Sequence, residues 1–152
     1  MKTVKDIFER KQKAFNFVEP GTIVYDALVQ LNSVNLSYLI VMEGNEYKGI
    51  FSERDYTRNV ILKGRASNST KVSEVMSTDF PMVRLTDSVE QCTHILNAHK
   101  TRYLLAYDED QQFIGVVTIH DLLRQVIADK EAVFDHSLTE SLLDNDEDGL
   151  VF

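Results

Sequence analysis

Two short stretches of the sequence place a glycine, a hydroxyl group and a carboxyl group at the same spacing. They are Gly49, Ser52 and Asp55, and then Gly115, Thr118 and Asp121. A glycine at the end of a strand lets another part of the chain approach its backbone closely. A carboxylate exposed there could accept hydrogen bonds from both hydroxyl groups of a ribose. The same residues also fit a helix start, where the hydroxyl group caps a backbone N–H and the acid suits the helix dipole. Both interpretations stay open at this point.

The two stretches belong to an internal repeat. Residues 24–31 align with residues 89–96, and residues 38–41 align with residues 103–106 at the same offset. Residues 4–7 likewise resemble residues 72–75. Several elements in the same order indicate a duplication. We therefore expect a first repeat at residues 3–62, a polar linker at 63–71, a second repeat at 72–128 and an acidic C-terminal extension at 129–152.

Each repeat predicts the order strand, helix, strand, strand, helix. The predicted strands are Phe17–Val18, Tyr38–Met42 and Lys48–Phe51 in the first repeat, and Met82–Val83, Tyr103–Tyr107 and Phe113–Thr118 in the second. The first helices start near Thr22 and Asp87, with Asp87 and Glu90 as a capping pair, and the second helices start at Ser52 and Thr118. The sequence thus predicts an α/β (α+β) fold. Because one repeat is too small to bury its own sheet, we expect the two to pack with pseudo-twofold symmetry and to leave ligand clefts between them.

The repeats and their motifs resemble cystathionine-β-synthase-type (CBS) domains, whose tandem pair is called a Bateman module. The resemblance extends from about residue 3 to residue 128 and is to the small stand-alone bacterial type. It implies a non-catalytic regulatory sensor of adenosine-containing ligands: AMP, ADP, ATP, NAD or S-adenosylmethionine. It further implies that Asp55 and Asp121 hold the ribose, beside Ser52 and Thr118. The adenine site then maps to Val18, Tyr38, Ile40, Val83, Tyr103 and Leu105. The run 103–106, Tyr-Leu-Leu-Ala, departs from the His-Leu-Pro-Val-like run frequent in the family.

A basic cluster in the first repeat, if it lines the ligand site, favours phosphorylated ligands over cationic S-adenosylmethionine. The segment 54–65 contains one acid, Asp55, and four basic residues: Arg54, Arg58, Lys63 and Arg65. Arginine donates two parallel hydrogen bonds to a phosphate. The candidates for phosphate contacts are Arg54, Arg58, His120 and Arg102. The alternative is that these side chains form a solvated helix face.

Net charge, apolar runs and the spacing of histidines and acids argue against several other functions. The formal net charge of −8 disfavours nucleic acid and anionic membranes as partners. The apolar runs are too short for a membrane span, the N-terminus has no signal-peptide pattern, and the single cysteine fits a reducing cytoplasm. The four histidines lack metal-ligand spacing, and the acidic tail lacks the acid that would complete a calcium loop.

We therefore expect a cytoplasmic homodimer that binds an adenine nucleotide and signals to an unknown output protein. One alternative is a ligand-free interaction or dimerisation module. The other is an enzyme that acts on nucleotides, for which the sequence carries no Walker, Rossmann or nucleophile-elbow motif.

Overall fold

The computed structural model describes residues 1–11 and 15–128, and this part of the chain divides into two compact units. The first-repeat unit contains residues 15–79. The second-repeat unit contains residues 80–128 together with residues 1–11. The lead-in segment of each repeat therefore folds with the other repeat. The predicted acidic extension, residues 129–152, lies outside the described residues.

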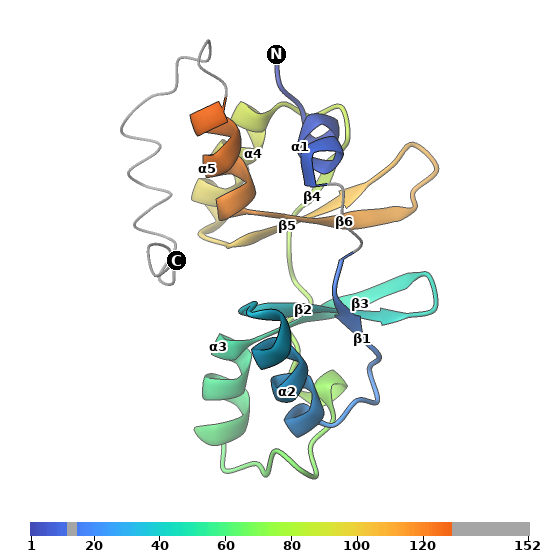
Figure 1. Cartoon of the computed structure of the whole chain (residues 1–152), viewed down its shortest axis with the longest axis vertical. Helices are drawn as coiled ribbons and strands as arrows, with labels where there is room; N and C mark the ends of the chain where they lie inside the picture. The colour runs from blue at the N-terminus through green and yellow to red at the C-terminus, as the bar shows by residue number, and fades with distance from the viewer. Residues whose placement is uncertain (12–14, 129–152) are drawn as a thin grey trace. The chain divides into compact units, whose positions relative to one another are not determined.

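The first-repeat unit has a sheet of order β1-β2-β3, with helices on one of its faces (Figure 1). Its elements are β1 (Phe17–Val18), α2 (Val24–Val34), β2 (Tyr38–Glu43), β3 (Glu46–Ser52), α3 (Glu53–Asp55), the π-helical η1 (Tyr56–Ile61) and the 3₁₀-helical η2 (Val72–Glu74). Strands β1 and β2 are parallel, and β2 and β3 form an antiparallel hairpin.

The second-repeat unit repeats this plan. Its elements are α1 (Val4–Lys11), β4 (Met82–Arg84), α4 (Val89–His99), β5 (Tyr103–Tyr107), β6 (Phe113–Thr118) and α5 (Ile119–Ala128). The sheet order is β4-β5-β6, with β4 and β5 parallel and β5 and β6 antiparallel. The predicted fold class and the predicted order of elements in each repeat are confirmed.

Alternation along the strands gives each sheet two different faces. Leu39, Val41 and Phe51 face α2 and pack against Val24, Ala27 and Leu31, which recur at helical spacing. In the second-repeat unit Leu104, Ala106 and Val117 pack in the same way against Cys92 and Leu96 of α4. The residues between them, including Ile40 and Leu105, lie on the opposite sheet face and outside these core clusters.

The exchanged lead-in segments complete the two cores. Val4 and Ile7 of α1 are buried in the core of the second-repeat unit. Val72 and Val75 occupy the matching place in the first-repeat unit. Ser77, just beyond, pairs with Ile50 on the outer edge of β3, and each backbone N–H of the pair donates to the other residue's carbonyl, at 2.8 and 2.9 Å.

The glycine of each motif makes room for these segments. A Cβ atom on Gly49 would lie 2.8 Å from Met76 Sδ and 2.9 Å from the Ser77 carbonyl oxygen. A Cβ atom on Gly115 would lie 2.8 Å from Cε1 of Phe8. The close approach expected at these glycines is therefore present, and its partner in each unit is the lead-in segment.

The predicted capping pair of α4 is wrong by one residue. Ser88, not Asp87, is the N-cap, and its hydroxyl oxygen accepts a hydrogen bond from the Gln91 N–H at 3.0 Å, while Gln91 Oε1 accepts from the Ser88 N–H at 2.8 Å. Asp87 instead accepts a hydrogen bond from the Arg84 N–H and closes the turn before the helix. Ser88 has the extended backbone that an N-cap requires, with φ −76° and ψ 153°.

The predicted linker packs against the start of α2. The Val24 N–H donates to the Thr70 carbonyl at 2.8 Å, and the Tyr25 N–H donates to the Ser67 carbonyl at 2.9 Å. Two of the N–H groups that a helix start leaves without intrahelical partners are thereby satisfied, since the residue before α2, Ile23, makes no side-chain cap. Across residues 1–11 and 15–128, no helix has the length and apolar character needed to cross a membrane.

Candidate functional site

Asp55 is bound to the start of its own helix. Ser52 ends β3 and is the N-cap of α3, and its hydroxyl oxygen accepts a hydrogen bond from the Asp55 N–H at 3.2 Å. Asp55 Oδ2 in turn accepts from the Ser52 N–H and from the Ser52 hydroxyl, both at 2.9 Å. This is a reciprocal capping box, so the helix-start interpretation of Ser52 and Asp55 is confirmed.

Thr118 and Asp121 form the equivalent pair. Asp121 Oδ2 accepts a hydrogen bond from the Thr118 N–H at 2.9 Å, and the Asp121 N–H donates to Thr118 Oγ1 at 3.2 Å. Both acids are almost fully buried, with 7% of each residue exposed. The two motifs therefore share one geometry, and each acid is held in a fixed orientation by its own cap.

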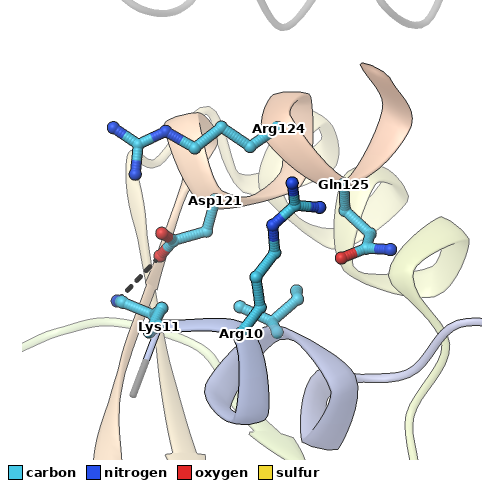
Figure 2. Close-up of a pocket in the computed structure, with 6 residues that line it drawn as sticks. Arg10, Lys11, Asp121, Arg124 and Gln125 are labelled. Atoms are coloured by element: carbon cyan, nitrogen blue, oxygen red, sulfur yellow. Dashed lines mark hydrogen bonds and ion pairs between the residues drawn. The ribbon is translucent and has the colours of Figure 1, made fainter. Parts of the chain in front are cut away.

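Each motif acid has a second partner in the exchanged lead-in segment. Asp55 Oδ1 accepts a short hydrogen bond of 2.6 Å from the Ser77 hydroxyl. Asp121 Oδ2 forms an ion pair of 2.9 Å with Lys11 Nζ (Figure 2). The same ammonium group donates to the Val116 carbonyl at 3.0 Å. The Val116 carbonyl corresponds to that of Ile50, which accepts from the Ser77 N–H. One ammonium group in the second-repeat unit thus replaces a hydroxyl and an amide in the first.

This arrangement determines what the acids can still bind. Both carboxylate oxygens of Asp55 already accept hydrogen bonds, whereas no group among the described residues donates to Oδ1 of Asp121. A carboxylate has about four lone-pair positions, so capping does not exhaust either group. A ribose would add to the cap bonds or displace the lead-in partner, which is neutral at Asp55 and cationic at Asp121.

Strand register places part of the predicted adenine site beside the capping hydroxyls. Tyr38 pairs with Ser52, and Ile40 pairs with Ile50 two residues along, so these side chains share the sheet face away from α2. Tyr103 pairs with Thr118 in the same way, with Leu105 on the same face. The Phe80 and Tyr103 rings pack in a T-shaped arrangement, with a centroid distance of 5.6 Å.

The other two predicted adenine residues occupy the cores. Val18 and Val83 are 5% and 2% exposed, and they belong to the clusters that face the helices. Their side chains therefore lie on the face opposite to Tyr38 and Tyr103. The structure does not bring the six predicted adenine residues together on one face.

Two exposed apolar residues were missed by sequence reasoning. Phe17 pairs with Ile40 and Met82 pairs with Leu105, which puts both on the same sheet faces as the tyrosines. Phe17 is 51% exposed and Met82 is 67% exposed. They occupy equivalent places in the two repeats, one residue before Val18 and Val83. A two-residue strand of large apolar side chains was the available signal, because alternation must turn one of the two away from the core.

The predicted phosphate residues are dispersed over several elements. Arg54 is half-buried on α3, Arg58 is exposed on η1, His120 is half-buried on α5 and Arg102 is half-buried before β5. Arg65 of the basic run donates to the Glu74 carbonyl at 3.3 Å. Among the described residues, the cation that reaches a motif acid is Lys11, and no sequence pattern predicts it there.

Comparison with known proteins identifies the repeats. A family model for the CBS domain matches residues 4–61 and 72–128. The chain is 28% identical over 134 residues to the mitochondrial CBS domain-containing protein CBSX3 of Arabidopsis thaliana, and the match covers 82% of this chain and 65% of that protein. The match to the plant protein thus spans slightly less than two thirds of its length.

Solved structures give the same result. One is described as a putative signal-transduction protein with CBS domains from Burkholderia ambifaria, with a TM-score of 0.77, 31% identity and coverage of 88% of this chain and 100% of that chain. Another is CBSX2 in complex with AMP, with a TM-score of 0.69, 25% identity and coverage of 86% and 100%.

Proposed function

Because this chain belongs to the family of CBS-domain proteins, with two CBS domains in tandem, we propose that it is a regulatory module that binds an adenosine-containing nucleotide. The observation that carries the proposal is the similarity over most of the chain to a CBS protein solved in complex with AMP. The candidate ligands are AMP, ADP, ATP and NAD.

In this proposal the ribose is held by the motif residues, Asp55 with Ser52 and Asp121 with Thr118. The fixed orientation of both carboxylates supports the assignment, because a preorganised acceptor loses little freedom when a ligand binds. The adenine lies against the sheet face that carries Tyr38 and Ile40 in the first repeat, and Tyr103 and Leu105 in the second. The exposed side chains of Phe17 and Met82 extend that apolar surface. The residues that the sequence predicts for phosphate contacts remain candidates: Arg54, Arg58, His120 and Arg102.

Ligand binding is tested by thermal unfolding with AMP, ADP, ATP, NAD and S-adenosylmethionine, with GMP as the control for base identity. A ligand at 100 times its dissociation constant stabilises the folded state by about 2.7 kcal/mol, which raises the melting temperature of a domain of this size by about 5–10 °C. An unchanged melting temperature with every adenine compound would favour the alternative of a ligand-free interaction module. Release of free phosphate or nicotinamide during incubation would instead indicate an enzyme.

Substitution of the motif acids separates capping from ribose binding. Asp55→Asn and Asp121→Asn keep an oxygen that can accept the cap N–H, but they remove the charge that favours ribose hydroxyl donors. We expect each variant to weaken ribose-containing ligands at its own repeat, measured by calorimetric titration. If affinity stays unchanged while the melting temperature falls, both acids serve only the helix starts.

The proposed assembly is a homodimer formed through the second helices of the repeats. The support for it is that Leu62, at the end of η1, and Ile127 of α5 are 72% and 79% exposed.

A further inference from the structure

An open pocket lies between α1 and α5 inside the second-repeat unit. It has a volume of about 310 Å³ and lies beside the Lys11–Asp121 ion pair (Figure 2). Its lining consists of Ile7, Arg10, Lys11, Asp121, Arg124 and Gln125. All six residues belong to the same unit, and one of them is the motif acid that the proposed function assigns to a ribose.

The pocket is cationic in a protein whose net charge is −8. Three basic side chains line it, and Asp121 is the single acid among its lining residues. Lys11 is paired with Asp121, while Arg10 and Arg124 are exposed and have no acidic partner within residues 1–11 and 15–128. The local excess of positive charge therefore belongs to two arginines that are available to an incoming anion.

The geometry suits an anion attached to a group bound at Asp121. Arg10 and Arg124 come from different helices, and Figure 2 shows Arg10 extending toward α5, with its guanidinium group between Asp121 and Gln125 in this view. Guanidinium groups match the oxygens of a phosphate with paired N–H donors. Lys11, whose side chain is 30% exposed, adds a point charge to the lining of the pocket.

We propose that this pocket holds the phosphate group of a nucleotide whose ribose is bound by Asp121, and that it selects phosphorylated ligands at the second repeat. The inference rests on the proposed function. Arg10 and Arg124 donate to the phosphate oxygens, and Lys11 lies between the phosphate and the Asp121 carboxylate. Because a bound phosphate attracts the ammonium group that neutralises Asp121, phosphate and ribose contacts at this acid are coupled.

In the first repeat the motif acid has no basic partner among the described residues. The lead-in partner of Asp55 is the neutral hydroxyl of Ser77, and no basic side chain among the described residues bonds to Asp55. Phosphate selectivity should therefore differ between the two repeats even though their sheets and capping boxes match. The difference in affinity between a phosphorylated ligand and the same ligand without phosphate would therefore be smaller at Asp55 than at Asp121.

The test compares AMP, ADP and adenosine by calorimetric titration of the full chain. The pocket variant is Arg10→Gln combined with Arg124→Gln, and the control is Lys5→Gln, an exposed cation on α1 that does not line the pocket. Because Arg10 and Arg124 are exposed, the double variant should keep its melting temperature. We expect it to weaken AMP and ADP at least tenfold and to leave adenosine unchanged, and the control should bind all three like the parent protein.

The outcomes separate this inference from the proposed function. Equal affinity of the parent protein for adenosine and AMP, or unchanged affinity of the double variant for AMP and ADP, overturns the phosphate pocket and leaves nucleotide binding intact. An equal loss for adenosine and AMP in the double variant also overturns it, because the arginines would then act on the whole site. If the parent protein binds no adenine compound, the proposed function and this inference fail together.

Discussion

At the scale of single residues, the glycine of each motif is explained by the segment that lies against it. The missing side chain of Gly49 is replaced by Met76 and the Ser77 carbonyl, which bring Ser77 to Asp55. The missing side chain of Gly115 is replaced by the Phe8 ring, on the helix that carries Lys11. In both repeats the glycine thus serves the acid indirectly, by seating the segment that holds its second partner.

Gly49→Ala should destabilise the first-repeat unit. The new methyl group would lie 2.9 Å from a backbone carbonyl, which cannot move without breaking the pairing of Ser77 with Ile50. We expect a loss of about 1–3 kcal/mol in the free energy of unfolding, measured by urea denaturation. Gly21→Ala is the matched control, since nothing lies within 4 Å of its new methyl group. Equal stability of the two variants would contradict the close approach.

The thiol of Cys92 should be unreactive in the folded protein. Burial, together with a smaller contribution from the nearby Asp87 carboxylate, raises its pKa to about 12. Because the reactive form is the thiolate, alkylation by iodoacetamide at pH 8 should proceed only after denaturant is added. The raised pKa also means that the folded state is favoured below the ordinary thiol pKa and loses this contribution as pH rises toward 12. Rapid alkylation without denaturant would show that α4 opens readily.

At the scale of elements, the start of α4 tests the corrected capping pair. Gln91→Ala removes the acceptor of the Ser88 N–H, and we expect it to lower the free energy of unfolding by about 0.5–2 kcal/mol. Glu90→Ala is the control, because its partner is His94, in an exposed contact of 3.9 Å, and such surface pairs contribute little. Thermal denaturation of the two variants gives the comparison. A larger effect at Glu90 would restore the pair that the sequence predicts.

The elements predicted from periodicity agree closely with the structure. Strands β1, β5 and β6 have the predicted bounds, because alternation and apolar runs are local properties of the sequence. The sequence predicts the N-cap of α4 one residue too early, because Asp87 and Ser88 are both good capping residues and backbone conformation selects between them. The predicted capping of the second helices at Ser52 and Thr118 agrees with the structure, since hydroxyl and acid occur at the required spacing.

At the scale of the whole molecule, the sequence could not show which repeat receives each lead-in segment. Residues 4–7 and 72–75 match one another, so either repeat offers an equally suitable apolar surface. The exchange is what brings Lys11 to Asp121 and Ser77 to Asp55, and it therefore makes the two sites unequal. Sequence reasoning found the motif acids and missed their partners for this reason: the acids lie within one repeat, whereas the partners come from the segment preceding the other.

Two exposed apolar side chains indicate where the proposed dimer interface lies. Leu62 directly follows η1, and Ile127 lies on α5; burial of a side chain of this size contributes about 1.5–3 kcal/mol. We expect the parent protein to be a dimer, and Leu62→Glu combined with Ile127→Glu to make it monomeric in size-exclusion chromatography with light scattering. Met82→Glu introduces the same charge at an exposed apolar position of β4 and should leave the dimer intact. A monomeric parent protein would contradict the proposed dimer. Dissociation by Met82→Glu alone would place the interface on β4 and not on the second helices.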